Sequence, residues 1–360
     1  MTIASAAVWS SQRPVQALRS VDAATVRAVA DAVREGLLRT RMRLPPWLLY
    51  DAQGSALFED ITDLPEYYLT RAERGILASH AGEIIEAAGA PPTVIELGAG
   101  SASKTQLLLA ALLDRQTHVT FVPVDVSAAA LVLAQSELSR LRRLTVRPVV
   151  ARYPEELGFL DAPSERRLLL FLGSSIGNYD PSSARKLLRA VRRHLVPGDK
   201  FLIGTDLRKA GSVLVPAYDH AQGVTARFNK NVLVRINREV GATFDVDHFE
   251  HVVHWNRAAS RIELYLASVV AQTVSLGTVG AKIHFAPGKR IHTESSYKFT
   301  RAMRDDRSPA RRRRLSSGTN LVRRTTSVRP PPRLCFLTGH AALGRCGVLS
   351  SRAPAAFSLD

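Results

Sequence analysis

The sequence contains little cysteine and no long hydrophobic run. Only two of its 360 residues are cysteines, Cys335 and Cys346, so the preceding chain can form neither a disulfide framework nor a thiolate metal site. No stretch approaches the roughly 18 consecutive apolar residues that suggest a membrane-spanning helix. The first residues also lack the basic and apolar regions of a secretory signal. We therefore expect a cytoplasmic protein that does not contact a membrane.

Motifs of several other enzyme classes are absent as well. The sequence has no GxSxG nucleophile elbow and no phosphate-binding P-loop. His248, His251 and His254 are spaced by three and lie close to Glu250. This spacing differs from the HExxH motif, and at helical pitch the three rings would not share one face. We therefore expect no metal site.

Apolar residues make up 46% of the sequence, which is enough for sizeable cores and excludes global disorder. Between residues 93 and 207, short β-prone runs alternate with segments of helical apolar spacing. The fourth run, RRLLLFLGSSIGN (166–178), is almost continuously apolar, as a strand buried on both faces should be. The alternation predicts an α/β fold, in which helices cover both faces of a parallel sheet.

Changes in composition divide the chain into segments. We expect a mobile N-terminal arm (1–43), an ordered N-terminal part of a substrate-binding subdomain (44–80), the α/β core (81–207), an inserted substrate-binding subdomain over the C-terminal edge of the sheet (208–290), a loop-like return to the core (291–300) and an atypical arginine-rich tail (301–360).

A glycine loop follows the first predicted strand. Gly98 and Gly100 permit positive φ angles and a close approach of the backbone to a ligand. The dinucleotide fingerprint needs a third glycine, and Ser103 stands there instead. Acidic residues before the loop (Glu96) and after the second strand (Asp125) favour S-adenosylmethionine, whose ribose hydroxyls can donate to a carboxylate. A plain tight turn and a nicotinamide dinucleotide site are the alternatives.

Seven sequence blocks extend this pattern from about Leu44 to Thr300. They read VIELGAGSASKTQLLL, FVPVDVS, LFLGSSIGNYDP, LIGTDLRK, AYDHAQGVTARFNKNVL, FDVDHFEHVVHWN and IHTESSYKF. Together they resemble the L-histidine Nα-methyltransferases of ergothioneine biosynthesis. The resemblance implies a class I S-adenosylmethionine-dependent methyltransferase fold, which is Rossmann-like, with an inserted substrate-binding subdomain. It also implies the transfer of three methyl groups from S-adenosylmethionine to the α-amino group of L-histidine, which gives hercynine.

The resemblance further implies two sets of binding residues. The cofactor-binding residues would be Gly98, Lys104, Asp125, Arg152 and Tyr153, with Lys104 reaching the methionine carboxylate from the first turn of a helix. The histidine-binding residues would be Tyr50, Tyr67, Gly173, Asn178, Tyr218, Glu294 and Ser296, and Asn178 and Tyr67 would also act in catalysis.

The chemistry of these side chains suits the substrate. Asn178 offers both a donor and an acceptor to the amine and the carboxylate. Glu294 and Ser296 are two apart on an extended segment, so they point to the same side and can bind the two imidazole nitrogens. A buried carboxylate without a matching donor is costly, which would select histidine. Taken alone, however, Asn178 could equally be a helix cap, Tyr67 a core aromatic residue and Lys104 an exposed helix residue.

Two features depart from the family's pattern. Arg152 stands where the family usually carries an acidic residue facing the adenine amino group, so we expect weaker adenine binding unless Tyr153 packs on the ring. The second departure is the tail from residue 301, which contains 13 arginines, no lysine and 3 acidic residues. It carries +10 of the chain's net charge of +17.

Our hypothesis for this tail is a frameshift near codon 300, because arginine, alanine and proline without lysine are typical of GC-rich DNA read out of frame. A frameshift would remove a helix and a sheet strand, leave an apolar sheet edge unpaired and give this exact chain weak or no activity. A genuine arginine-rich nucleic-acid tail and a disordered extension are the alternatives.

The main prediction is therefore a monomeric enzyme that methylates L-histidine and binds no nucleic acid. A methyltransferase for another amino acid or small amine is the first alternative. A nucleic-acid-binding protein that uses the basic tail is the second.

Overall fold

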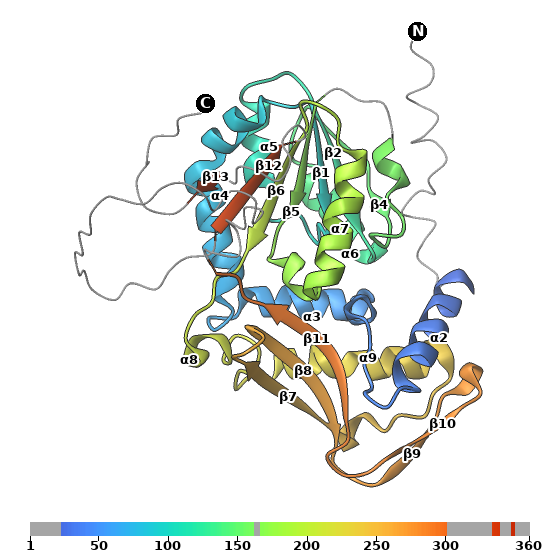
Figure 1. Cartoon of the computed structure of the whole chain (residues 1–360). Helices are drawn as coiled ribbons and strands as arrows, with labels where there is room; N and C mark the ends of the chain where they lie inside the picture. Colours follow the sequence, from blue (N-terminus) through green and yellow to red (C-terminus); the bar gives the residue numbers. More distant parts are fainter. Residues whose placement is uncertain (1–22, 162–165, 301–332, 339–346, 350–360) are drawn as a thin grey trace, which may run out of the picture.

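The computed structural model describes residues 23–161 and 166–300, together with the backbone of two short strands at 333–338 and 347–349. These residues form an α/β core, which is the upper part of Figure 1, and a subdomain of helices and strands, which is the lower part. Helix α3 (Ala52–Asp63) lies at their junction.

A mostly parallel sheet forms the centre of the core. Its strand order is β13-β12-β6-β5-β1-β2-β3, with β4 paired to β2. Chain order runs outward in opposite directions from β1 and β5, and open α/β sheets bind ligands at such a switch point. The strands are β1 (Thr93–Leu97), β2 (Val119–Asp125), β3 (Leu144–Val146), β4 (Val149–Val150), β5 (Arg167–Phe171), β6 (Lys200–Thr205), β12 (Arg333–Thr338) and β13 (Gly347–Leu349).

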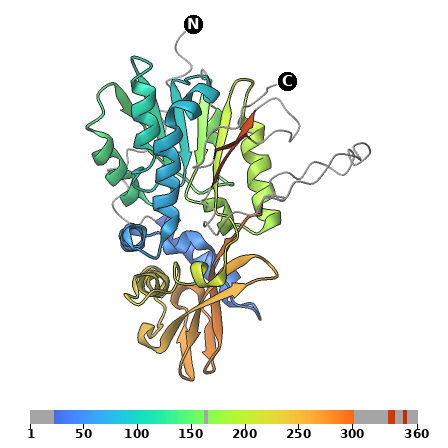
Figure 2. The same ribbon diagram turned by 90° about the vertical axis from the view of Figure 1, so that its left-hand side faces the viewer.

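Alternate residues of the central strands pack into two separate hydrophobic cores. Every residue of β5 is buried; Leu168 and Leu170 join one core, whereas Leu169 and Phe171 join the other. Helices cover both faces of the sheet (Figures 1 and 2), which confirms the predicted fold class. They are α4 (Tyr68–Ala88), α5 (Gln106–Leu113) and α6 (Ala128–Leu138) at the first core, and α7 (Pro181–His194) with the 3-10 turn η3 (Gly158–Asp161) at the second.

Three helices near the switch point begin at a capping side chain. Asp51 accepts from the backbone of α3, Ser127 from that of α6 and Asp180 from that of α7. Each cap satisfies backbone N–H groups that have no partner in the first helical turn. These short polar residues therefore determine where the helices start along the edge of the sheet.

The tail contributes to this sheet, which contradicts the expectation of an unpaired edge. Strand β12 pairs antiparallel with β6 from Arg333 opposite Thr205 to Thr338 opposite Lys200, and β13 pairs with β12. The sequence of β12, RLCFLT, is rich in β-prone apolar residues, a pattern that the sequence analysis overlooked. Because β6 is paired, the part of that argument that rests on an unpaired edge at β6 is wrong. The remaining tail lies outside the described residues.

The subdomain joins segments from both ends of the described chain. A three-stranded antiparallel sheet, β11-β8-β7, and a hairpin, β10-β9, share one hydrophobic core with helices from residues 23–63 and 211–240. Its elements are α2 (Ala23–Leu37), η2 (Pro46–Leu49), α3, α8 (Gly211–Leu214), α9 (Val224–Val240), η5 (Val246–His248), β7 (Phe249–Asn256), β8 (Arg261–Ser268), β9 (Gln272–Ser275), η6 (Gly277–Val279), β10 (Lys282–Phe285) and β11 (Arg290–Tyr297).

Part of the predicted N-terminal arm is an ordered helix. Val29, Val33 and Leu37 of α2 are almost fully buried in the subdomain core. Spacings of four residues place these side chains on one helical face, a pattern that indicates packing and that the prediction of a mobile arm neglected. Residues 1–22 lie outside the described part.

Residues 290–297 form strand β11 where the sequence analysis predicted a loop. The register against β8 shifts between His292 and Glu294, which leaves Thr293 as one extra residue, a β-bulge. Ile291 before the bulge and Glu294 after it both lie opposite core residues of β8. The bulge hides the strict alternation by which a strand is recognised in a sequence.

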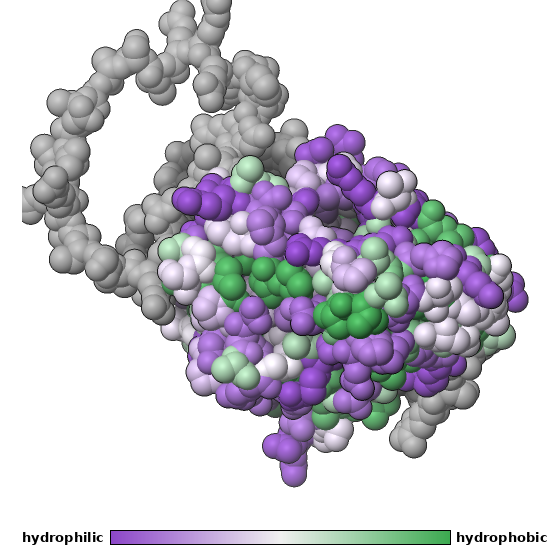
Figure 3. Space-filling model, turned by 90° about the horizontal axis from the view of Figure 1, so that it is seen from below, coloured by the Kyte–Doolittle hydropathy of each residue, from purple (hydrophilic) through white to green (hydrophobic). Residues whose placement is uncertain are grey.

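The underside of the subdomain has a mixed surface. Figure 3 shows hydrophobic patches separated by hydrophilic side chains on this face. Among the described residues, no helix is long and apolar enough to cross a membrane.

Candidate active site

The glycine loop after β1 adopts the predicted backbone. Gly98 and Gly100 have φ angles of 69° and 54°, a region that glycine enters without strain. The N–H groups of Gly98 and Ala99 donate to the carbonyl of Val124 on β2 (2.8 and 3.1 Å). A Cβ atom on Gly98 would lie 2.8 Å from the hydroxyl of Tyr153, so a larger residue would displace this side chain as well as strain the backbone.

Asp125 ends β2 and holds the adjoining loops. Its Oδ2 atom accepts from the Gly100 N–H (3.0 Å) and its Oδ1 atom from the Ser127 N–H (2.9 Å). Burial raises the pKa of Asp125, and these backbone N–H groups oppose the shift. Ser127 also bonds to Ser55 of α3 (2.8 Å), which ties the subdomain to this edge of the sheet.

A large cleft of about 1420 Å³ opens at this edge. Its lining includes a group of residues predicted from the sequence: Tyr50, Gly98, Asp125, Arg152, Tyr153 and Asn178. The cleft thus brings four of the five predicted cofactor residues together at the switch point. Tyr153 packs edge-on against Phe171, with ring centroids 5.8 Å apart.

Arg152 is directed toward the subdomain. Its guanidinium lies 5.2 Å from the centroid of the Trp47 ring, and Arg235 of α9 lies 5.6 Å from the same ring. Arg235 also donates to the Leu48 carbonyl (3.1 Å). The reversed charge at position 152 is therefore placed against an aromatic face, an arrangement that stabilises a cation.

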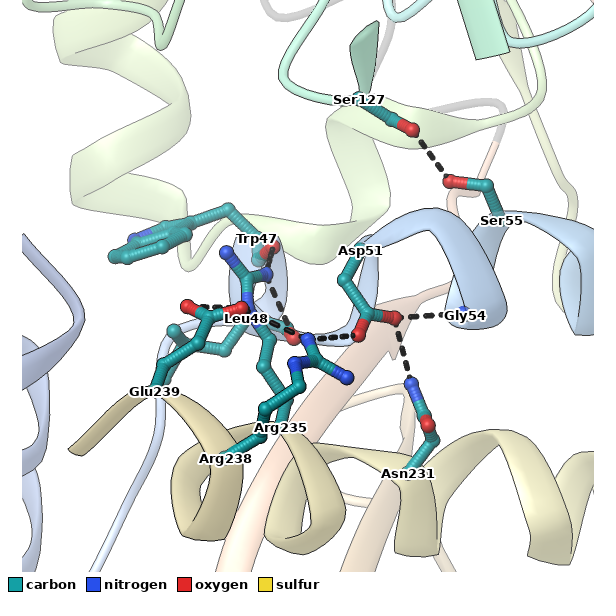
Figure 4. Close-up of polar contacts among 10 residues, drawn as sticks. All are labelled: Trp47, Leu48, Asp51, Gly54, Ser55, Ser127, Asn231, Arg235, Arg238 and Glu239. Atoms are coloured by element: carbon teal, nitrogen blue, oxygen red, sulfur yellow. Dashed lines mark hydrogen bonds and ion pairs between the residues drawn. The ribbon is translucent and has the colours of Figure 1, made fainter. Parts of the chain in front are cut away.

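The residues around Trp47 fasten the segment that carries Tyr50 (Figure 4). Asp51 accepts from Gly54 N–H, from the Asn231 amide and from Arg238, each at 2.7 Å. One carboxylate thus caps α3 and binds α9 at two points. Tyr50, which immediately precedes Asp51, is thereby held at the wall of the cleft.

The position of Lys104 differs from the predicted one at the cofactor site. Its ammonium group forms an ion pair with the buried Glu73 of α4 and is absent from the described lining of the cleft. The Glu73 carboxylate also accepts from the Gly173 N–H (3.0 and 2.8 Å). Glu73 therefore joins one predicted cofactor residue to one predicted histidine-binding residue.

The sequence analysis missed Glu73, although its spacing carried a signal. It lies on the same helical face as Leu69, Ile76 and Leu77, all of which are buried. A carboxylate on an apolar helix face indicates a buried polar contact.

Glu73→Ala is expected to lower the free energy of unfolding by roughly 3 kcal/mol, because it leaves the partly buried ammonium of Lys104 and the Gly173 N–H without this acceptor. Urea denaturation followed by circular dichroism measures the change. Glu73→Gln is the matched variant, since its amide oxygen can still accept from Gly173. Equal stability of Glu73→Ala and the unchanged protein would contradict the assigned contacts.

A smaller cavity of about 50 Å³ adjoins the cleft. Tyr50, Ser175 and Asn178 line both spaces. The lining of the small cavity contains all seven predicted histidine-binding residues: Tyr50, Tyr67, Gly173, Asn178, Tyr218, Glu294 and Ser296.

Polar groups on opposite walls of this cavity contact one another. Asn178, at the end of η4 (Ser175–Asn178), donates through Nδ2 to Oε1 of Glu294 (3.0 Å). The hydroxyls of Tyr218 and Ser296 lie 2.8 Å apart. Burial raises the pKa of Glu294 to about 7, although Lys298 opposes the shift. Tyr67 and Tyr218 pack edge to face, with ring centroids 6.1 Å apart.

A buried charged cluster behind this wall was not predicted. Lys298 has no exposed surface and forms an ion pair with Asp206 (3.0 Å). Asp206 also pairs with Lys209 and accepts from the Tyr68 hydroxyl (2.6 Å). Burial raises the pKa of Asp206, but Lys298 and Lys209 together lower it below its usual value. The sequence did carry a signal for this cluster. Lys298 follows Glu294 and Ser296 at spacings of two, which place all three side chains on one face of a strand.

Of the three histidines set aside in the sequence analysis, His248 ends the 3-10 turn η5, and His251 and His254 lie on strand β7. His251 bonds to Asn229 (2.9 Å) and to the Tyr218 carbonyl (2.9 Å). Burial lowers the pKa of this imidazole. His251 therefore supports the loop that carries Tyr218.

Comparisons with known proteins point to one family of enzymes. The model of a family described as "Histidine-specific methyltransferase, SAM-dependent" matches residues 29–312. The histidine N-alpha-methyltransferase of Mycolicibacterium smegmatis is 45% identical over 74% of this chain and 83% of that protein. Its namesake from Mycobacterium tuberculosis is 44% identical over the same shares. Ergothioneine biosynthesis protein 1 of Schizosaccharomyces pombe is 34% identical over 72% of this chain and 34% of that protein.

These matches confirm the predicted family, and with it the enzyme class and the methyl donor, S-adenosylmethionine. The chain belongs to the family of histidine-specific, S-adenosylmethionine-dependent methyltransferases.

Proposed function

We propose that this enzyme transfers three methyl groups in succession to the α-amino group of L-histidine and so forms hercynine. The observation that carries the proposal is the small cavity, whose walls contain all seven predicted histidine-binding residues. It meets the large cleft at Asn178, so an amine held there would face a methyl donor in the cleft. We also propose that the enzyme acts as a monomer, since one chain supplies every residue of the proposed site.

The cleft residues fit the proposed methyl donor. Asp125 presents a buried carboxylate for the ribose hydroxyls, beside a glycine loop whose two glycines have positive φ angles. We also propose that Tyr153 packs against the adenine ring and that Arg152 stays on Trp47, away from the adenine amino group. The Lys104 ammonium would have to leave Glu73 in part to meet the methionine carboxylate.

In the proposed mode of binding, the imidazole lies between Glu294 and Ser296. The α-amino group lies at Asn178, Tyr67 holds the carboxylate, and Tyr218 bonds to Ser296 (2.8 Å) beside the ring. Asn178 uses its Nδ2 atom to bond Glu294 (3.0 Å), which leaves its Oδ1 atom as an acceptor for an amine N–H. One residue thereby links recognition of the ring to orientation of the amine.

Bound S-adenosylmethionine supplies an electrophilic methyl group. Each transfer would form an N–C bond as the S–C bond breaks, and would release S-adenosylhomocysteine together with one proton to solvent. Such a direct displacement needs no covalent intermediate, so the protein contributes mainly alignment and exclusion of water. Tyr50, Tyr67 and Phe58 surround the approach with aromatic rings, and Asn178 holds the amine so that its lone pair faces the cleft.

The test is incubation of the purified chain with histidine and S-adenosylmethionine, followed by mass spectrometry. A product that has gained three methyl groups on its α-nitrogen is expected. An end product with one or two methyl groups would contradict trimethylation. Faster turnover of another amino acid than of histidine would contradict the proposed substrate.

We expect kcat/KM for histidine to fall as the pH drops below about 7. The carboxylate of Glu294, which would accept the ring N–H, is present above its raised pKa of about 7 and is lost as the pH falls through that value. A pH profile from about 5.5 to about 9 measures this fall. In Glu294→Gln, the step at the raised pKa of Glu294 should be absent. Only the groups of free histidine should then shape the acidic side, namely the imidazole, with a pKa of about 6.5, and the α-amino group, with a pKa of about 8. Coincident profiles for the two proteins would refute the assignment.

A further inference from the structure

The ammonium group of Lys298 makes all its contacts with other side chains of the protein. Its Nζ atom donates to the Tyr218 hydroxyl (2.8 Å) and to the Ser296 hydroxyl (3.0 Å), and it pairs with the Asp206 carboxylate (3.0 Å). The side chain is fully buried. An ammonium group has three donors and no acceptor, so these three contacts account for all its hydrogens.

This contact has a consequence for the two hydroxyls. Both Tyr218 and Ser296 must accept from Lys298, because Lys298 cannot accept from them. They also share one hydrogen bond with each other (2.8 Å), in which either can donate. The pair has two hydroxyl protons, and one of them lies in that shared bond. One O–H is therefore left, and both side chains line the small cavity.

The opposite wall of the cavity has the reverse polarity. Glu294 is an acceptor when ionised, and Asn178 already donates to one of its oxygens. The cavity therefore offers one acceptor wall and one donor wall. A neutral imidazole matches both, since it carries one N–H donor and one bare nitrogen acceptor. An imidazolium ion has two donors and would direct one of them at the spare O–H.

We propose that Lys298 is a positioning residue that determines this hydrogen-bond polarity, and thereby the specificity for a ring with one donor and one acceptor. The inference rests on the proposed function, because it assumes that the imidazole lies in this cavity. Lys298 does not touch the ring in this arrangement; it acts through Tyr218 and Ser296.

Lys209 supplies a matched control. After loss of Lys298, Asp206 keeps Lys209 and the Tyr68 hydroxyl as partners, so no buried carboxylate is left unpaired. Lys209 is also buried and also pairs with Asp206, yet none of its described bonds reaches Tyr218 or Ser296. Lys209→Met therefore removes a similar charge without changing the hydroxyl pair.

The experiment measures the affinity of the full chain, saturated with S-adenosylhomocysteine, for histidine and two sets of ring analogues by calorimetry at about pH 8.5, where the free imidazole is neutral. Pyrrolylalanines keep the ring N–H and lack the acceptor nitrogen. Thiazolylalanines keep an acceptor nitrogen and lack the N–H. Both positional isomers of each are used, so that the result does not depend on which ring nitrogen meets which wall.

In the unchanged protein, pyrrolylalanines are expected to bind roughly 10- to 100-fold more weakly than histidine, because they leave a buried O–H without an acceptor. Lys298→Gln adds an amide oxygen that can take the spare proton, and this penalty should shrink to a few-fold. Lys298→Met adds no acceptor, so the penalty should persist in this variant. Thiazolylalanines lack the ring N–H that Glu294 would accept, so their weaker binding should persist in all variants. Lys209→Met should bind both sets of analogues as weakly as the unchanged protein does.

Three outcomes would overturn the inference. One is equal affinity of the unchanged protein for histidine and pyrrolylalanines, a result that needs no variant to fold. Another is a uniform loss of affinity for all ligands in both Lys298 variants, which indicates a structural role only. The third is the same change in Lys209→Met. A protein that binds S-adenosylhomocysteine but not histidine would instead refute the proposed function.

Discussion

Asp125→Asn is expected to weaken binding of S-adenosylhomocysteine by roughly 100-fold or more, because hydrogen bonds to a charged group contribute about 1.5–3 kcal/mol each. The carboxylate accepts from the N–H groups of Gly100 and Ser127, and we propose that it also accepts from the two ribose hydroxyls. An asparagine amide nitrogen cannot accept, so it would face at least one of these donors unfavourably. Calorimetric titration of S-adenosylhomocysteine measures the effect.

Asp114→Asn is the control for this substitution. Asp114 is an exposed aspartate at the end of α5 in the same α/β core, and its amide variant should bind S-adenosylhomocysteine normally. If Asp125→Asn bound equally well, the carboxylate would have no role in holding the ribose.

Glu294→Leu is expected to reduce kcat/KM for histidine by about a thousandfold or more, because sites built to hydrogen-bond a ligand discriminate by such factors. The change removes the proposed partner of the ring N–H and the acceptor of the Asn178 amide (3.0 Å). It should therefore disturb both the ring and the orientation of the amine. Steady-state kinetics with histidine and with apolar amino acids measure the loss of preference.

Glu250→Leu tests whether any glutamate on this sheet has the same effect. Glu250 lies on β7, which β8 separates from β11 in the same sheet, and its side chain is exposed, so its replacement should leave kcat/KM unchanged. A histidine preference that survived Glu294→Leu would favour another acceptor group and contradict the assigned role.

The α/β core could be predicted because its signals are local. A few consecutive residues were enough to predict strand β5, from its almost continuous apolar run, and the turn at Gly98 and Gly100. Strand β5 is buried throughout, and both glycines have positive φ angles. The seven proposed histidine-binding residues could be predicted only through the ordered blocks of the family, since they come from segments between Tyr50 and Ser296 that meet only in the folded chain.

Buried charges were the part that sequence patterns could not supply. Glu73, Asp206 and Lys298 are charged residues with little or no exposed surface, and composition alone places such residues in solvent. Their partners lie far away in the chain: Glu73 meets Lys104 and Gly173, and Lys298 meets Tyr218. A single sequence does not show which residues far apart in the chain come into contact.

The bulge at Thr293 restricts where insertions and deletions can be accepted in relatives of this enzyme. A sequence without Thr293 would return β11 to strict alternation, with Glu294, Ser296 and Lys298 still on the cavity side. A sequence without Ser295 would place Glu294 and Ser296 on opposite faces and dismantle the cavity. Among functional homologues, a one-residue gap in this strand should therefore align with Thr293.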